Sequence, residues 1–337
     1  MEIRDYIIVP DVVKIKSNTD YIHYFSFAER LDKIFQPHPT KVEIEFYIIK
    51  DIQKPKELNL RFYLFYGNED GNKIYYERPL FGNFKAKMLV ENEEGNAKIL
   101  VNSFYYNFVK FKIDNLFPPG INLTDITTIK LLEKGFTPTH SSCVSLNGDG
   151  ILFFAPPNTG KSLTTFLAIR KGYHFLSEDI TVIDKEYAYS CPLTSTFLYL
   201  LPNKTLSFKF YNFASKFGIL SYFLKKPKTS FFSVSNNLKI DKKAKIKIVC
   251  ILERGEEKVQ KINKNDAFRR LLILNRNEFS YYKNPLLFAY SYFTPTLDLN
   301  KLMKKEEEII STVVDESDCF LLRSNDPRKY IELLRGL

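Results

Sequence analysis

The residues best suited to do chemistry are "APPNTGKS", residues 155–162, because the stretch ends in Gly160, Lys161 and Ser162. A phosphate-binding loop of the pattern G-x-x-x-x-G-K-[ST] uses this ending to place backbone N–H groups, an ammonium and a hydroxyl around a polyphosphate and its Mg²⁺. We predict a nucleotide site here. The residues expected to contact the nucleotide are Ala155, Pro156, Pro157, Asn158, Thr159, Gly160, Lys161, Ser162 and Leu163.

The first half of this loop departs from the pattern. Ala155 replaces the first glycine, and it is the smallest residue able to do so. Pro156 and Pro157 lack N–H donors but stiffen the chain, and Asn158 tolerates left-handed backbone angles better than most residues. A bare match also arises by chance on a Pro-rich turn. An apolar strand before the loop and an amphipathic helix after it argue against chance.

Two acids and a histidine are expected to join the loop. Glu178 and Asp179 follow the predicted strand "HFL". Phosphoryl transfer commonly uses one carboxylate for Mg²⁺ and another for the proton of the attacking hydroxyl. A Glu-Asp pair alone is usually a solvated turn. The stretch "NGDG" predicts a β-hairpin. If its turn is centred on Gly148 and Asp149, residues that pair across the two strands have numbers that sum to about 297. His140 would then lie roughly opposite Pro157.

The elements that position these residues follow from patterning. Residues 1–128 hold short segments rich in Ile, Val, Tyr and Phe, such as "KVEIEFYII", and predict a β-rich domain of antiparallel sheets with one solvated face. Residues 129–337 alternate strands and helices and predict an α/β domain. In it, "SLTTFLAIRK" predicts a helix that stops at Gly172, and "AKIKIVCILERG" predicts a core strand.

Composition narrows the class of protein. The chain of 337 residues is 45% hydrophobic, which suffices for two domains. We expect a cytoplasmic protein without membrane association, since no run approaches the roughly 18 apolar residues of a span and "MEIRD" lacks a signal-peptide core. The cysteines form no C-x-x-C pair, which favours buried thiols over disulfides or zinc: Cys143, Cys191, Cys250 and Cys319. The remaining histidines are expected to be structural: His23, His38 and His174.

The segment "THSSCVSLNGDGILFFAPPNTGKSLTTFLAIRKGYHFLSEDITVID" resembles the HPr kinase/phosphorylase family and its phosphoenolpyruvate carboxykinase-like relatives. In that family a histidine precedes a hairpin, the second strand enters G-x-x-G-x-G-K-S, a helix ends in a basic-Gly step, and a strand ends in Asp-Asp. The resemblance covers about residues 130–190 well and the rest of the C-terminal half in outline. It implies a P-loop kinase domain of this type, preceded by the β-rich domain.

The resemblance also implies an activity. Members transfer the γ-phosphoryl group of ATP to a hydroxyl, usually a serine of a protein or peptide, and relatives phosphorylate free serine. By resemblance, His140, Lys161, Glu178 and Asp179 are catalytic, with Glu178 at the position of the base and Ser162 and Asp179 on the Mg²⁺ side. The two acid roles are open to exchange.

Departures from the family pattern sharpen these expectations. Glu178 is one methylene longer than aspartate, which moves the base and alters substrate choice. The family's glycine- and arginine-rich motif for reverse phosphorolysis is not found, which favours a plain kinase. Arg254 follows a predicted strand, and either reaches the transferring phosphoryl group or is an ordinary surface arginine.

Other functions stay open. Between Tyr187 and Ile240 lysines and aromatics alternate without one Asp or Glu, which suits a packed insertion, a docking surface for an acidic peptide, or single-stranded nucleic acid. The formal charge of +10 favours anionic partners, but no RNA-binding signature is present. The main alternative to a protein kinase is a nucleotide-responsive binding module. The sequence leaves homo-oligomers open.

Overall fold

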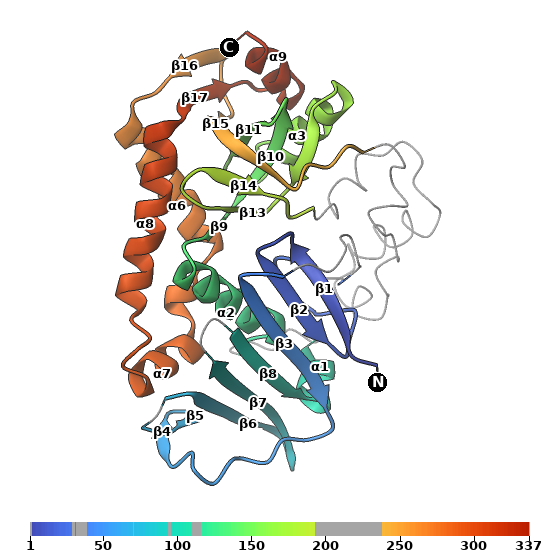
Figure 1. The fold of residues 1–337 in the computed structure, drawn as a ribbon, viewed down its shortest axis with the longest axis vertical. Helices are drawn as coiled ribbons and strands as arrows, with labels where there is room; N and C mark the ends of the chain where they lie inside the picture. The colour runs from blue at the N-terminus through green and yellow to red at the C-terminus, as the bar shows by residue number, and fades with distance from the viewer. Residues whose placement is uncertain are drawn as a thin grey trace. The chain divides into compact units, whose positions relative to one another are not determined.

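The computed structural model describes residues 2–28, 31, 39–69, 71–93, 96–109, 116–192 and 238–336. The chain forms two compact units, both of which mix helices and strands (Figure 1). Unit 1 is Met1–Pro138 with Arg276–Ser311, and unit 2 is Thr139–Asn275 with Thr312–Leu337. Most of the basic aromatic stretch, together with His38, lies outside the described residues.

The division follows packing rather than chain order. The expected boundary between residues 128 and 129 falls inside helix α2 (Pro119–Glu133), which is buried along nearly all of its length. A single cut there would split a core helix. Residues 276–311 belong with unit 1 although they lie between the two segments of unit 2 in sequence.

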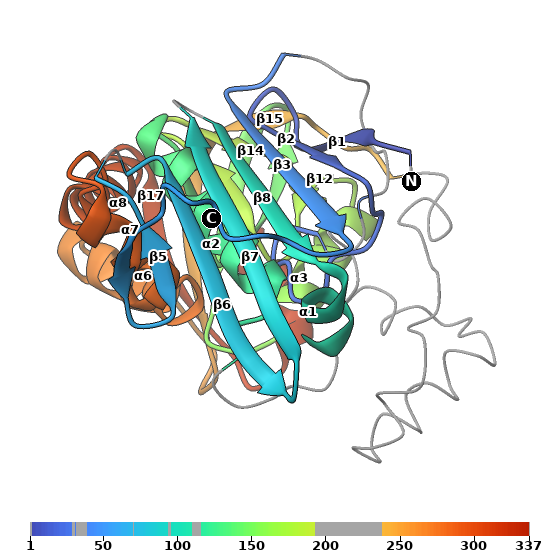
Figure 2. The ribbon, with the colours of Figure 1, turned by 90° about the horizontal axis from the view of Figure 1, so that it is seen from below.

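Unit 1 is built on an eight-stranded sheet in the order β1-β2-β3-β8-β7-β6-β5-β4 (Figure 2). Its strands are β1 (Arg4–Val9), β2 (Val13–Ser17), β3 (Val42–Ile49), β4 (Leu60–Phe62), β5 (Phe65–Gly67), β6 (Lys73–Phe81), β7 (Phe84–Glu93) and β8 (Asn96–Asn102). The expectation of purely antiparallel pairing is wrong, because β3 pairs in parallel with both β2 and β8. Long connections between these strands allow the parallel return, which a tight hairpin does not.

The helical elements of unit 1 come from both of its chain segments. They are α1 (Ser103–Phe108), α2, η4 (Tyr281–Lys283), α7 (Pro285–Phe293) and most of α8 (Leu299–Glu316). The predicted one-sided burial is confirmed on β3, whose first six residues alternate between buried and half-buried positions.

Unit 2 contains the predicted hairpin, helix and core strand. Its sheet runs β12-β10-β11-β15-β14-β13-β9, and β17 joins both β15 and β16. The strands are β9 (Thr137–Thr139), β10 (Ser141–Leu146), β11 (Asp149–Phe154), β12 (His174–Ser177), β13 (Thr181–Ile183), β14 (Tyr187–Tyr189), β15 (Lys243–Glu253), β16 (Lys258–Lys261) and β17 (Asp318–Arg323). The helical elements are α3 (Lys161–Arg170), α6 (Lys264–Glu278), η5 (Pro327–Lys329) and α9 (Tyr330–Leu334).

The core of unit 2 holds the strand that leads into the loop. β11 runs parallel to β15, and β15 runs parallel to β17. Phe153 of β11 is fully buried and belongs to one apolar cluster with Cys250 and Leu252 of β15 and Leu322 of β17. This packing fixes the end of β11, where the loop begins.

The cysteines are all free and buried, which confirms the interpretation as interior thiols. Burial raises the pKa of Cys143, Cys191 and Cys250 well above that of an exposed thiol. In the part of the chain that the structure describes, none of the helices combines the length and the apolar character that a membrane crossing requires.

Candidate functional site

The hairpin that leads into the loop turns one residue earlier than expected. Asn147 (φ 55°) and Gly148 (φ 88°) are its two central residues, and the strands pair from Leu146 opposite Asp149 to Ser141 opposite Phe154. A type I′ turn needs positive φ at both central positions, which Asn-Gly provides more easily than Gly-Asp. Continuing this register sets His140 level with Ala155, at the start of the loop, instead of level with Pro157.

The loop backbone has the left-handed residues that a phosphate loop needs. Asn158 has φ 62°, as expected from its replacement of a glycine, and Gly160 has φ 117°. Gly160 is also required sterically, because a Cβ there would clash with Pro327 of η5. Pro156, Pro157 and Asn158 are exposed, whereas Thr159 is buried.

Helix α3 begins directly at Lys161, so the N–H groups of its first turn adjoin the loop. It ends where predicted: Gly172 (φ 96°) donates its N–H to Ile169 O, and Tyr173 donates to Ala168 O. These two bonds form a Schellman motif, in which glycine takes the left-handed position. The predicted helix and its stop are therefore confirmed.

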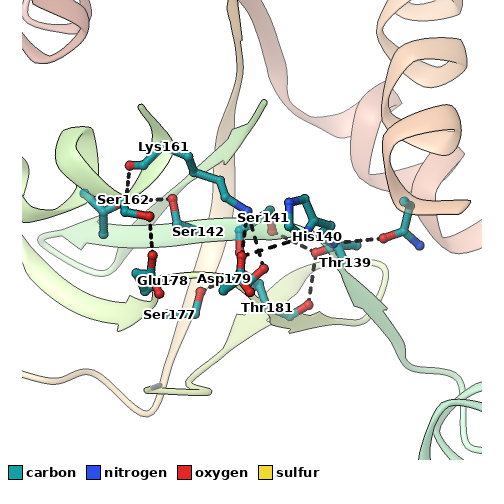
Figure 3. A network of polar contacts seen from close by, with 12 residues as sticks. Thr139, His140, Ser141, Ser142, Lys161, Ser162, Ser177, Glu178, Asp179 and Thr181 are labelled. Atoms are coloured by element: carbon teal, nitrogen blue, oxygen red, sulfur yellow. Dashed lines mark hydrogen bonds and ion pairs between the residues drawn. The ribbon is translucent and has the colours of Figure 1, made fainter. Parts of the chain in front are cut away.

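Three predicted residues converge beside the loop (Figure 3). The Nζ of Lys161 lies 3.3 Å from Asp179 Oδ1 and 3.5 Å from Asp179 O. The Nδ1 of His140 lies 3.7 Å from the same Oδ1. Lys161 is 8% exposed, while half of the Asp179 side chain reaches solvent. The cluster is thus anchored inside the protein and open on the side of Asp179.

The second acid faces the start of α3. The hydroxyl of Ser162 donates to Glu178 Oε1, and Glu178 is only 1% exposed. The sequence assigned Ser162 and Asp179 to the Mg²⁺ side and left the two acid roles open to exchange; the structure brings Ser162 to Glu178, and the Mg²⁺ assignment stays a prediction. The two acids lie in the bend that follows β12, where Glu178 contacts Ser162 and Asp179 contacts Lys161.

The imidazole of His140 is held in its neutral form. Burial, followed by the positive charge of Lys161, lowers its pKa to about 4, although Asp179 acts in the opposite direction. At neutral pH the ring therefore carries no charge. It can donate or accept one proton in a hydrogen bond without adding to the positive potential of Lys161.

Buried hydroxyls connect the strands beneath the site with one another and with α3. Thr165 Oγ1 donates to Ser142 Oγ (2.7 Å), and Thr181 Oγ1 donates to the Ser141 carbonyl (3.0 Å). Sequence reasoning missed these residues because a Ser or Thr in a strand carries no local sign of its partner. The labelled members of this network in Figure 3 are Thr139, Ser141, Ser142, Ser177 and Thr181.

Two further polar residues adjoin the loop and its histidine. Arg254 donates to the carbonyls of Asn158 (3.4 Å) and Asn325, so this arginine braces the loop backbone. Asn275 of α6 accepts a hydrogen bond from the backbone N–H of His140 (2.9 Å). The sequence pointed to Arg254 through its position after a strand, but nothing in the sequence pointed to Asn275.

The donor set fits a magnesium ion that arrives with a nucleotide. The hydroxyl of Ser162 and the carboxylates of Glu178 and Asp179 are oxygen ligands, which Mg²⁺ prefers. Within the described ranges, no three His, Cys, Asp or Glu side chains cluster closely enough to hold a metal by themselves. Mg²⁺ commonly binds through one or two carboxylates together with substrate phosphates.

Comparisons with known proteins do not assign this chain to a family. No protein-family model matches the chain, and no curated protein matches it significantly. Among solved structures, the chain is similar to the Hpr(Ser) kinase/phosphatase from Coxiella burnetii, at 10% identity and a TM-score of 0.21. The match covers 37% of this chain and 77% of that chain. A likeness of this extent carries no argument about function.

Proposed function

We propose that this protein is an ATP- and Mg²⁺-dependent kinase that transfers the γ-phosphoryl group to a hydroxyl, most readily a serine of a protein or peptide. One observation carries the proposal: Lys161, His140 and Asp179 converge within 3.3 to 3.7 Å beside a loop that ends in Gly-Lys-Ser. The resemblance found in the sequence supports the choice of reaction.

The loop and α3 form the phosphate-binding part of this site. Backbone N–H groups at the start of a helix attract anions, and the Lys161 ammonium adds a full positive charge. Without a nucleotide this ammonium pairs with Asp179. A bound triphosphate competes for the ammonium and frees the Asp179 carboxylate for catalysis.

The contacts favour exchanged roles for the two acids. Because Ser162 already bonds to buried Glu178, we assign these two residues to Mg²⁺, which when bound would neutralise charge on the phosphate oxygens. Asp179 is half exposed and lies next to His140, so it is placed to accept the proton of the acceptor hydroxyl. The Nδ1 of neutral His140 lies 3.7 Å from Asp179 Oδ1, so a small movement on nucleotide binding would bring the ring into hydrogen-bond distance of that carboxylate and orient it.

Radiolabelled ATP tests the proposal directly. Wild type, Lys161→Ala and the control Lys185→Ala are incubated with serine-containing peptides and with free serine, and transfer of label is measured. We expect Lys161→Ala to lose at least about a hundredfold in transfer, because the cation stabilises charge in the transition state. Lys185 is exposed in the turn between β13 and β14, and its loss should change transfer by less than about twofold.

The outcomes separate the alternatives. ATP binding without transfer to any acceptor would favour the nucleotide-responsive binding module. Absence of both binding and transfer in the wild type would contradict the proposal.

A further inference from the structure

The histidine of the site occupies a break between two strands. His140 is the single residue between β9 and β10. At such a break the strand ladder does not pair the backbone N–H, and a buried N–H needs another acceptor. Asn275 provides it, with Oδ1 at 2.9 Å from His140 N. Asn275 is fully buried, and it lies 135 residues away in sequence.

The neighbours of His140 are tied to the strand that follows the acids. Thr139 Oγ1 donates to Thr181 O, and Thr181 Oγ1 donates back to Ser141 O, both at 3.0 Å. Thr181 begins β13, two residues after Asp179. These bonds fix the chain on both sides of His140, whereas the bond to Asn275 fixes the backbone of His140 itself.

We propose that Asn275 is a positioning residue that directs the imidazole of His140 towards Asp179 and Lys161. The inference rests on the proposed function. If the amide oxygen is removed, the partly buried N–H of His140 loses this acceptor, and the ring moves as the backbone turns towards another one. A displacement of about 1 Å in a catalytic site can cost about a hundredfold in rate.

Three variants isolate this role. Asn275→Leu keeps a similar volume but has no acceptor, whereas Asn275→Asp keeps an acceptor oxygen at the same place. Leu271 is a buried apolar residue of the same helix and has no polar group to offer His140. Leu271→Ala therefore measures what disturbed packing of α6 does without loss of the hydrogen bond.

The readouts are MgATP turnover, with water as the acceptor if no better one is found, and hydrogen exchange at the His140 amide. For Asn275→Leu we expect kcat at least about tenfold lower, KM for MgATP within about twofold, and amide exchange about a hundredfold faster. Asn275→Asp should keep kcat within about threefold, and Leu271→Ala should lower Tm while keeping kcat within about threefold.

The inference is overturned if folded Asn275→Leu keeps both wild-type turnover and wild-type amide exchange, or if Leu271→Ala loses as much turnover as Asn275→Leu. A wild type that neither binds nor turns over MgATP overturns the proposed function, and the inference falls with it. An active wild type with an unaffected Asn275→Leu sinks the inference alone.

Discussion

Two polar clusters, one in each unit, differ in whether opposite charges and solvent reach their ionisable groups. In unit 1, Asp125 of α2 is 5% exposed and accepts a hydrogen bond from Asn284, which also donates to Asn122. In unit 2, Lys161 and Asp179 keep opposite charges close together, and Asp179 remains half exposed. The first cluster is sealed and contains no cation among these residues. The second is open and charged, as a site for an ionic ligand must be.

The electrostatic consequences also differ in sign. Burial raises the pKa of Asp125 to about 7, and the Asn284 hydrogen bond only partly opposes this. Burial and Lys161 lower the pKa of His140 to about 4. In both places the interior favours the neutral form, because taking a charge out of water is costly. The comparison teaches that a buried ionisable group marks a functional site only where other charges face it.

The largest expected effect concerns the charges of the open cluster. Glu178→Gln and Asp179→Asn should each lower phosphoryl transfer by about a hundredfold, since each removes one carboxylate from the reaction. Glu178→Gln should also raise the Mg²⁺ concentration needed for half-maximal rate, and Asp179→Asn should not. Rates measured across a Mg²⁺ titration check this, and the reverse pattern would assign the metal to Asp179.

An effect of similar size is expected in the sealed cluster, but on stability rather than on activity. The folded pKa of Asp125 is raised, so its contribution to stability is full below about pH 4 and is lost as pH rises to about 7. Asp125→Asn avoids that loss. Its free energy of unfolding should exceed that of wild type by roughly 2 to 4 kcal/mol at pH 8 and equal it near pH 3. Urea unfolding across pH measures the difference.

This variant also tests the contrast between the clusters. Its phosphoryl transfer should stay within about twofold of wild type, because the hydrogen-bond donor to Asp125 is Asn284, a buried residue of unit 1. A large loss of transfer would show that the sealed cluster takes part in function.

The smallest expected effect is that of His140 on stability. It is seen at acidic pH, whereas the effect of Asp125 is seen at neutral pH and above. Its folded pKa is lowered, so the stability that neutral His140 allows is present above about pH 6.5 and is lost as pH falls through about 4. As pH falls over that range, the free energy of unfolding of wild type should therefore fall by about 1 to 2 kcal/mol more than that of His140→Asn, after discounting for partial exposure. Thermal unfolding at pH 7 and pH 4 gives the value, and parallel losses in both proteins would argue against a buried neutral ring.

What the sequence determined about this protein is local. Asn158 and Gly160 take the left-handed angles that their residue types permit, and α3 starts at Lys161 and stops before Gly172. These features depend on interactions within a few residues, so residue type and spacing suffice to predict them. The turn at Asn147 and Gly148 was misplaced by one position because two adjacent dipeptides both suit a hairpin.

The tertiary structure decided the rest. Only the tertiary structure shows that β3 runs parallel to β2 and β8. It also shows that Ser162 bonds to Glu178 rather than to Asp179, and that Asn275 accepts the N–H of His140. Each of these depends on which distant segments meet and on the direction in which a side chain leaves a strand. Such encounters are selected by the packing of the whole core, and a local pattern of residues does not encode them.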